Sequence, residues 1–305
     1  MNKMDIKYKG KNISLISSNV TNVNNGNKSI DNYFSDINMV ENLPNIQILY
    51  ENFIKIYNNN NPHNSNDNYE KLIDLAMLAE QIENYEDMLF FVKEVIKNKK
   101  GLMDSDERNL FSRACKNYIS SNRKGNRIIE AYEDKERKKG HSDYLSYIIE
   151  YKNIKETISY IKYHNVIKFI EDNIIKKDNF RNYDDEAKTF FYKKLGDFHR
   201  YLCEIDKFKS KYINEADKYY NESLKFASKL PIYNSDKLGA ILNPTNFYYH
   251  FLNEKKKAID LAKSTIKKFE IESENLDKDD DYVIDAKNIC ETMKANLEIW
   301  EKSKI

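Results

Sequence analysis

From Tyr69 to Trp300, apolar side chains recur every three or four residues, the spacing that places them on one face of a helix. Asp104 with Glu107 is typical of a helix start, which predicts that a long helix begins there. The pattern predicts about nine helices joined by short loops, and therefore an all-α fold. Their expected ranges are about 69–82, 85–96, 104–137, 143–175, 184–205, 211–229, 235–252, 255–270 and 280–302.

The first 68 residues have a different character, because they are polar and rich in asparagine. Residues 1–31 lack helical periodicity, and we expect them to be poorly ordered. Ile46, Leu49, Phe53 and Ile56 return to helical spacing and predict an additional N-terminal helix around 45–57. A low-complexity linker follows. We therefore expect two parts, an N-terminal extension over 1–68 and a helical domain over 69–305.

Composition supports this organisation and narrows the function. Only 7 glycines and 4 prolines interrupt 305 residues, which favours long helices, and 13% aromatic residues can build a sizeable core. The net charge of +1 favours neither nucleic acid nor a membrane surface as a partner. No apolar run has transmembrane length.

Residues that could carry chemistry are few and scattered. The three cysteines are too far apart for a disulfide framework or zinc cluster, so we expect reduced thiols in the cytoplasm, with the nucleus as a second compartment. The 5 histidines show no metal-ligand spacing, and no glycine-rich phosphate loop is present. These patterns predict a protein that is not an enzyme and that holds neither a metal nor a cofactor.

A charged constellation is the main candidate site. Lys116 and Arg123 are seven residues apart, nearly two helical turns or about 10 Å of rise, so they share a face. Arg127 falls close to the same face, and a later helix carries Arg200 and Tyr201. If these faces oppose each other, guanidinium groups, an ammonium group and a phenol converge, which suits a phosphate. The alternatives are a solvated basic stripe and a structural salt-bridge network of Arg200 with Asp197 and Glu204.

Five ordered motifs resemble the 14-3-3 proteins and run from about Tyr69 to Trp300. They are Leu78–Met88 for the first loop, Glu107–Leu110 with Cys115–Asn117 for the third helix, Phe191–Tyr192 with Gly196–Leu202 for the fifth, Leu238–Asn243 with Phe247–Tyr249 for the seventh, and Asn296–Trp300 for the end of the ninth.

The resemblance implies a cup of nine antiparallel helices whose amphipathic groove binds phosphoserine or phosphothreonine segments of other proteins. Such an adaptor regulates signalling and catalyses nothing. Matched residue by residue, the implied phosphate ligands are Lys116, Arg123, Arg200 and Tyr201. The implied ligands of the peptide backbone are Asn243 and Asn296, and the implied apolar groove wall contains Leu242, Ile289, Ile299 and Trp300.

Several positions depart from the family pattern. Asn122 stands where one of two adjacent arginines is usual, Leu195 replaces a groove lysine, and His250 replaces a glutamate. Pro244 directly follows Asn243, so we expect a kink and less favourable helical geometry at Asn243. Phosphate capture should therefore be retained while the preference for flanking residues changes.

The family also forms dimers, and the resemblance implies a homo- or heterodimer here. The usual intersubunit ion pairs are mostly absent, since their positions fall at Asn84, Ile154 and Ile158. An apolar seam that includes Ile82 is one alternative, and plain core packing is the other. Two other functions stay open at this point: a helical scaffold that binds unphosphorylated partners through an apolar groove, and a nucleic-acid-binding protein.

Overall fold

A computed structural model describes residues 5–8, 11–14, 65–99, 101–140, 142–206, 210–274, 276 and 280–302. The chain forms two units, Met1–Glu51 and Asn52–Ile305. In the first, β1 (Asp5–Tyr8) and β2 (Lys11–Ser14) pair in antiparallel fashion, with Ile6 opposite Ile13. The sequence analysis did not predict this hairpin. The helix predicted at 45–57 lies outside the described residues.

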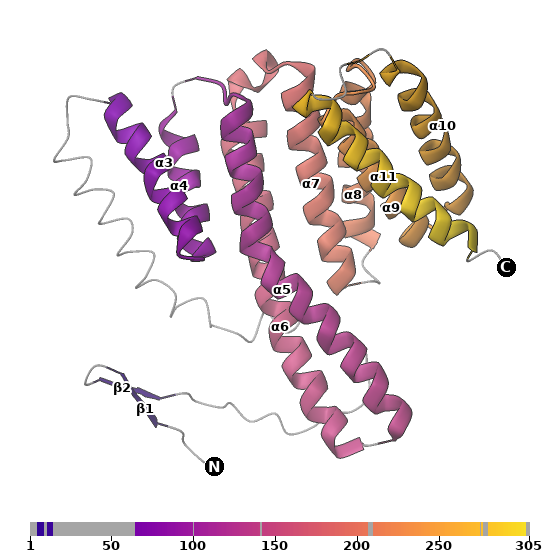
Figure 1. The fold of residues 1–305 in the computed structure, drawn as a ribbon. Helices are drawn as coiled ribbons and strands as arrows, with labels where there is room; N and C mark the ends of the chain where they lie inside the picture. Colours follow the sequence, from indigo (N-terminus) through magenta and orange to yellow (C-terminus); the bar gives the residue numbers. More distant parts are fainter. Residues whose placement is uncertain are drawn as a thin grey trace. The chain divides into compact units, whose positions relative to one another are not determined.

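The second unit is all-helical, as predicted. Its first helix begins at Ser65, earlier than the expected start near Tyr69. The described part of the chain contains nine α-helices: α3 (Ser65–Gln81), α4 (Tyr85–Asn98), α5 (Ser105–Lys139), α6 (Ser142–Ile170), α7 (Asp185–Ile205), α8 (Ser210–Ala227), α9 (Ser235–His250), α10 (Lys255–Ser273) and α11 (Asp281–Lys302) (Figure 1). A π-helical turn, Glu171–Ile175, and a 3-10 turn, Asp178–Asn182, connect α6 to α7.

Local sequence explains where the long helix α5 begins and ends. The Asp104 side chain accepts a hydrogen bond from the Glu107 N–H at 3.0 Å, and the Asp104 N–H donates to the Glu107 carboxylate at 2.8 Å. This reciprocal capping box satisfies two donors at the helix start that the sequence predicted. Gly140 ends the helix with φ 75°, a left-handed conformation that glycine adopts without steric cost.

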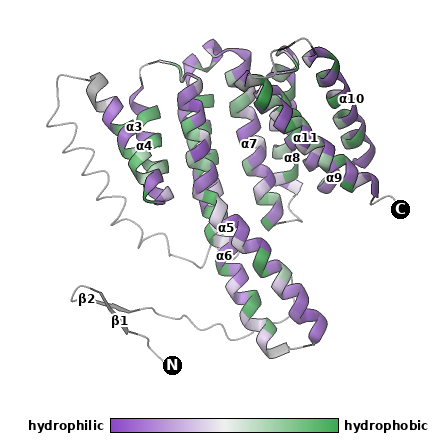
Figure 2. Ribbon diagram, viewed as in Figure 1, coloured by the Kyte–Doolittle hydropathy of each residue, from purple (hydrophilic) through white to green (hydrophobic). Residues whose placement is uncertain are grey.

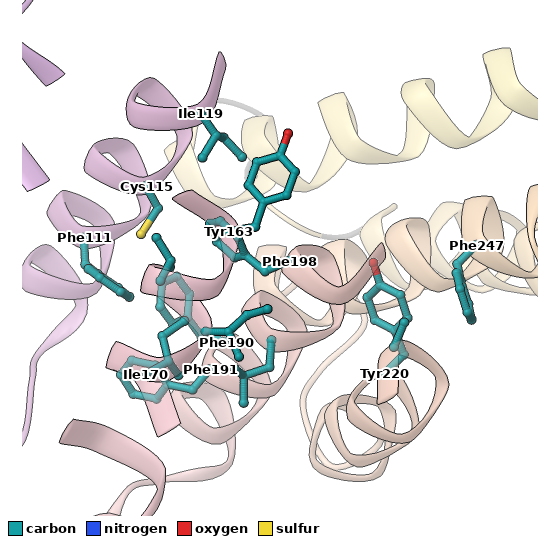
Figure 3. Close-up of a cluster of buried hydrophobic side chains, with 14 of the residues drawn as sticks. Phe111, Cys115, Ile119, Tyr163, Ile170, Phe190, Phe191, Phe198, Tyr220 and Phe247 are labelled. Atoms are coloured by element: carbon teal, nitrogen blue, oxygen red, sulfur yellow. The ribbon is translucent and has the colours of Figure 1, made fainter. Parts of the chain in front are cut away.

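Buried faces of neighbouring helices form one core in the second unit. Hydrophobic and hydrophilic residues alternate along the helices, as Figure 2 shows by colour. Phe111, Cys115 and Ile119 of α5 point toward side chains of α6 and α7, which include Tyr163, Phe191 and Phe198 (Figure 3). Burial of these large side chains excludes water and fixes the positions of α5, α6 and α7 relative to one another. The polar groups that these helices carry are therefore held on a rigid support.

The approach of α8 to α7 depends on one glycine. A Cβ atom at Gly196 would lie 2.5 Å from the ring of Tyr220, far inside van der Waals contact. The absence of a side chain therefore lets the Tyr220 ring lie directly against α7. This contact brings the Tyr220 hydroxyl to the polar groups of the next turns.

Pro244 lies within α9, which continues without interruption from Ser235 to His250. Asn243 lies inside this helix, so the less favourable geometry expected before Pro244 does not end α9. The Leu242 carbonyl accepts hydrogen bonds from the Thr245 hydroxyl at 2.7 Å and the Asn246 amide at 2.9 Å.

The three cysteines, Cys115, Cys203 and Cys290, are free and buried, as expected for reduced thiols. Burial raises the pKa of each thiol to about 12, so all three are protonated and unreactive at neutral pH. Among the described helices, none combines the length and the apolar character needed to cross a membrane.

Candidate functional site

Two arginines from separate helices meet at one carboxylate. Arg123 of α5 binds Glu204 of α7 with both ends of its guanidinium group, Nε to Oε2 at 2.8 Å and Nη2 to Oε1 at 2.6 Å. Arg200, one turn before Glu204 on α7, donates from Nη1 to the same Oε1 at 3.1 Å. The two guanidinium groups therefore lie side by side, and Glu204 prevents their repulsion from separating them.

Tyr201 completes this cluster. The guanidinium carbons of Arg123 and Arg200 lie 4.2 and 4.7 Å from the centroid of its ring. Burial raises the pKa of the Tyr201 phenol, so its hydroxyl remains available as a hydrogen-bond donor. We refer to Arg123, Arg200, Tyr201 and Glu204 as the arginine cluster.

The charges of the cluster stabilise one another. Burial alone would raise the pKa of the Glu204 carboxyl, but the hydrogen bond and charge of Arg123, and then the charge of Arg200, lower it. Burial likewise opposes the charge of Arg123, but the hydrogen bond with Glu204 raises its pKa. Arg123, Arg200 and Glu204 are therefore ionised at neutral pH, with two positive charges held by one negative charge.

A second layer of hydrogen bonds orients Arg200. Its Nε donates to the Tyr220 hydroxyl at 3.0 Å, and that hydroxyl donates to Asp197 Oδ1 at 2.8 Å. Asn243 of α9 donates from Nδ2 to both oxygens of Asp197, at 2.8 and 2.9 Å. Three helices, α7, α8 and α9, therefore hold the guanidinium group in place before any ligand arrives.

Two cavities adjoin the arginine cluster. The arginine cavity, of about 760 Å³, is lined by residues that include Arg123, Arg127, Arg200, Glu130, Glu156, Glu204, Asn243 and His250. The lysine cavity, of about 630 Å³, is lined by residues that include Lys116, Arg123, Lys124, Arg127, Lys194, Asp197, Tyr201 and Asn243. Since Arg123, Arg127 and Asn243 line both, the two cavities adjoin at these residues, and we refer to the two cavities together as the groove.

The structure brings together three of the four predicted phosphate ligands, Arg123, Arg200 and Tyr201. The fourth, Lys116, is exposed on α5 and lines the lysine cavity with Arg123 and Tyr201. Arg127 also approaches the cluster, with its Nη2 3.6 Å from Glu204 Oε1. The salt-bridge network that the sequence offered as an alternative is present too, so the cluster has a structural role whether or not it binds a ligand.

The predicted backbone ligands lie close to each other. Asn243 lines both cavities, and its Nδ2 is bound to Asp197, which leaves its amide oxygen to accept a peptide N–H. Asn296 of α11 donates from Nδ2 to the side-chain oxygen of Asn246 at 3.4 Å. Asn246 lines the arginine cavity, whereas Asn296 lines neither cavity and contacts this site through Asn246.

The four residues predicted for the apolar groove wall have different environments. Leu242 and Ile289 are half-buried against the core. Trp300 is only 2% exposed and stacks on Tyr249 at 4.5 Å between ring centroids, so it offers little surface to a ligand. Ile299 is 62% exposed. Their contribution to a groove wall stays a prediction.

Sequence reasoning missed two functional candidates. Tyr220 supports Arg200 from α8, and no spacing within α7 reveals a contact with another helix. Leu195, where a groove lysine is usual, is buried in the core, whereas its neighbour Lys194 lines the lysine cavity. Lys194 follows Lys193, and the presence of two consecutive lysines before a buried leucine was the available signal.

The sequence model of the 14-3-3 protein family matches residues 75–301. The chain is 33% identical to 14-3-3 protein 2 of Entamoeba histolytica over 235 residues. This matched region covers 76% of this chain and 95% of that protein. It is 32% identical to 14-3-3-like protein A of Hordeum vulgare, over 76% of this chain and 87% of that protein. The chain is also 32% identical to a 14-3-3-like protein of Solanum tuberosum, over 77% of this chain and 90% of that protein.

These matches and the helical fold define a non-enzymatic adaptor that binds other proteins. The chain belongs to the 14-3-3 family. Within the described residues, no group of three or more histidine, cysteine, aspartate or glutamate side chains is arranged to hold a metal ion.

Proposed function

We propose that the groove captures a phosphoserine or phosphothreonine of a partner protein and thereby regulates signalling. One observation carries this proposal: Arg123 and Arg200, from two helices, bind the same oxygen of Glu204 at 2.6 and 3.1 Å. An anion in the groove needs only to approach the other faces of two guanidinium groups that are already oriented. A phosphate carries about −1.5 to −2 charge and three acceptor oxygens, which suits several such donors together.

Glu204 acts as the internal counterion in this proposal. It holds the two arginines together in the free protein, so the ligand does not pay the full cost of bringing like charges side by side. Tyr201 donates its hydroxyl to the phosphate, and Lys116 adds a point charge from the lysine cavity. Asn243 accepts an N–H of the bound segment through its amide oxygen.

The scaffold for unphosphorylated partners is the competing proposal. A phosphopeptide array with an unphosphorylated twin of every peptide separates the two, and the Arg123→Ala variant assigns the binding to the cluster. Charge-assisted hydrogen bonds contribute about 1.5–3 kcal/mol each, so we expect the variant to lose at least about tenfold in affinity. Equal binding of phosphorylated and unphosphorylated twins would favour the scaffold.

Arg113→Ala is the matched control for this experiment. Arg113 lies on the same helix but pairs with Glu80 at 3.3 Å, away from both cavities. The control removes the same charge from α5, so it should keep its phosphopeptide affinity within about twofold. A similar loss in both variants would show that the net charge of α5, and not the arginine cluster, governs binding.

We also propose that residues 69–305 form the binding domain, with 1–68 as an N-terminal extension, and that the protein acts in the cytoplasm and the nucleus. Buried, protonated thiols suit such a reducing compartment. Expression of 69–305 alone tests the division, because a folded domain with full phosphopeptide affinity is expected.

Self-association is proposed from a second observation, an exposed apolar face on α6. Tyr147 is 70% exposed, and Tyr151, Ile154 and Ile158 continue its face at steps of three and four residues. On α3, Ile82 just beyond the helix end is 64% exposed, and Leu78 is exposed as well. Apolar surface of this kind is typical of contacts between subunits.

The double variant Ile154→Glu and Ile158→Glu should convert dimers to monomers in sedimentation velocity, since buried carboxylates cost several kcal/mol. Ile271→Glu on α10, also an exposed isoleucine, is the control and should sediment like the original protein. An unchanged sedimentation coefficient in the double variant would argue against this face.

A further inference from the structure

The two halves of the groove differ in charge. In the arginine cavity, three arginines face three glutamates, which are Glu130, Glu156 and Glu204. In the lysine cavity, five basic residues face a single carboxylate, that of Asp197. A ligand that lies along the groove therefore meets a balanced field on one side of the arginine cluster and an excess of positive charge on the other.

Asp197 does not neutralise the lysine cavity. Its two oxygens accept hydrogen bonds from Tyr220 and Asn243 at 2.8 to 2.9 Å, and Arg200 lies 3.7 Å away. This carboxylate is 5% exposed, and its hydrogen-bonding capacity is used by the network that orients Arg200. Glu204 pairs with Arg123 and Arg127, whereas the three lysines of the cavity, Lys116, Lys124 and Lys194, form no ion pair among the described residues.

Lys194 is the clearest case of such a charge. It is half-buried on α7, and its ammonium group lies 5.5 Å from the centroid of the Phe190 ring. No ion pair of Lys194 occurs in the part of the chain that the structure describes. Burial, and then the neighbouring charge of Lys193, lower the pKa of Lys194, and an anion beside it would offset both effects. Lys193 itself is paired with Asp236 at 2.7 Å.

Helix geometry sets the distance between Lys194 and the arginine cluster. Lys194 precedes Tyr201 by seven residues on α7, and Lys116 precedes Arg123 by seven residues on α5. Arg123 stacks on Tyr201, and Lys194 and Cys115 line the lysine cavity together. The two helices therefore run in parallel, and the backbone of Lys194 is separated from that of Tyr201 by about 10 Å of helix rise. Three residues of extended peptide span about 10 Å.

We propose that Lys194 forms a second anion subsite that selects partner segments with two phosphorylated residues three positions apart. The proposal rests on the proposed function, since the first phosphate occupies the arginine cluster and Lys116. The second phosphate enters the lysine cavity, where Lys194 approaches it from α7. Lys194 is the specificity-determining residue, because it brings a positive charge to this end of the groove from the helix opposite Lys116.

Calorimetry with the full chain tests the proposal with three peptides of one sequence. One carries a single phosphoserine, and two carry a second phosphoserine three residues before or after the first. The wild-type chain should bind one of the doubly phosphorylated peptides about tenfold more tightly than the singly phosphorylated peptide. In Lys194→Met the gain should fall below twofold, and in Lys194→Arg most of it should remain.

Lys267→Met is the matched control, because Lys267 is exposed on α10 and lines neither cavity. It loses the same charge and should keep the whole tenfold gain, while thermal unfolding checks the fold of each variant. The absence of a gain in the wild-type chain, or a gain that survives in Lys194→Met, would overturn the second subsite and leave the first intact. If the singly and doubly phosphorylated peptides all fail to bind, the proposed function itself is wrong.

Discussion

Buried polar groups on two faces of α7 differ in whether they form hydrogen bonds. On the groove face, Arg200 and Glu204 lie among partners of opposite charge, and their hydrogen bonds are satisfied. On the neighbouring face, His199 is 6% exposed, stacks on Tyr219 of α8 and has no hydrogen-bond partner for either ring nitrogen among the described residues. The hydrogen bonds of Arg200 and Glu204 orient their charges for a ligand. The unpaired ring nitrogens of His199, by contrast, lower the stability of the folded state.

Disruption of the hydrogen-bond network around Arg200 should have the largest effect on stability and on phosphopeptide affinity. Arg200→Ala removes the partner of Glu204 and Tyr220 and leaves a half-buried carboxylate with less compensation. Loss of one member of a buried ionic network typically costs about 3–5 kcal/mol of stability. We expect a large fall in the free energy of unfolding in urea and at least a hundredfold loss of phosphopeptide affinity. Unchanged stability would show that the network does not hold the helices together.

Replacement of the buried His199 should change how the free energy of unfolding depends on pH. Burial lowers the pKa of His199 from 6.5 to about 4, so between these values the unfolded chain binds a proton that the folded chain does not. Stability therefore falls as the pH is lowered through this window, by about 3 kcal/mol in total.

His199→Phe keeps the ring and removes its nitrogens. Urea unfolding at pH 7.5 and pH 5 should show a smaller difference in the variant than in the original protein. An identical pH dependence in both proteins would assign the effect to other groups.

Glu204→Gln separates the two roles of the internal counterion. The variant keeps an acceptor for the arginines but removes the charge that offsets their repulsion, so we expect a loss of about 2 kcal/mol in stability near neutral pH. Phosphate affinity should fall, because the ligand must then offset the repulsion between the two arginines that Glu204 offsets in the original protein.

The pH dependence of this difference provides a check. Because the pKa of Glu204 is lowered in the folded state, its stabilising contribution is present above about 4.3, the ordinary value, and is lost as the pH falls through the folded-state value. The stability of the two proteins should therefore converge in acid. A gap that persists at pH 2 would contradict this role.

A substitution outside α7 provides the reference with which the effects of the other variants are compared. Gly125 lies within α5, and a Cβ atom there would meet nothing within 4 Å. Gly125→Ala should stabilise the protein by up to about 1 kcal/mol through helix propensity, with phosphopeptide affinity unchanged. Destabilisation measured by thermal unfolding would mean that Gly125 has a role in the fold.

The helices and half of the site could be predicted from local patterns. Arg123 and Arg200 stand on helix faces that periodicity alone defines. By contrast, the contact of Tyr220 with α7 and the position of Lys194 depend on how helices pack against each other, which spacing within one helix does not specify. The hairpin at Asp5–Ser14 was missed because its four-residue strands give only a weak alternating signal.

The ionisation of the bound phosphate tests the central claim most directly. A phosphoserine peptide in complex with the full chain can be titrated by phosphorus NMR, which reports the second pKa of the phosphate, about 6 in the free peptide. Two guanidinium groups beside the phosphate favour the dianion, so this pKa should fall by at least about one unit on binding. A bound phosphate that titrates as in free solution would contradict the account.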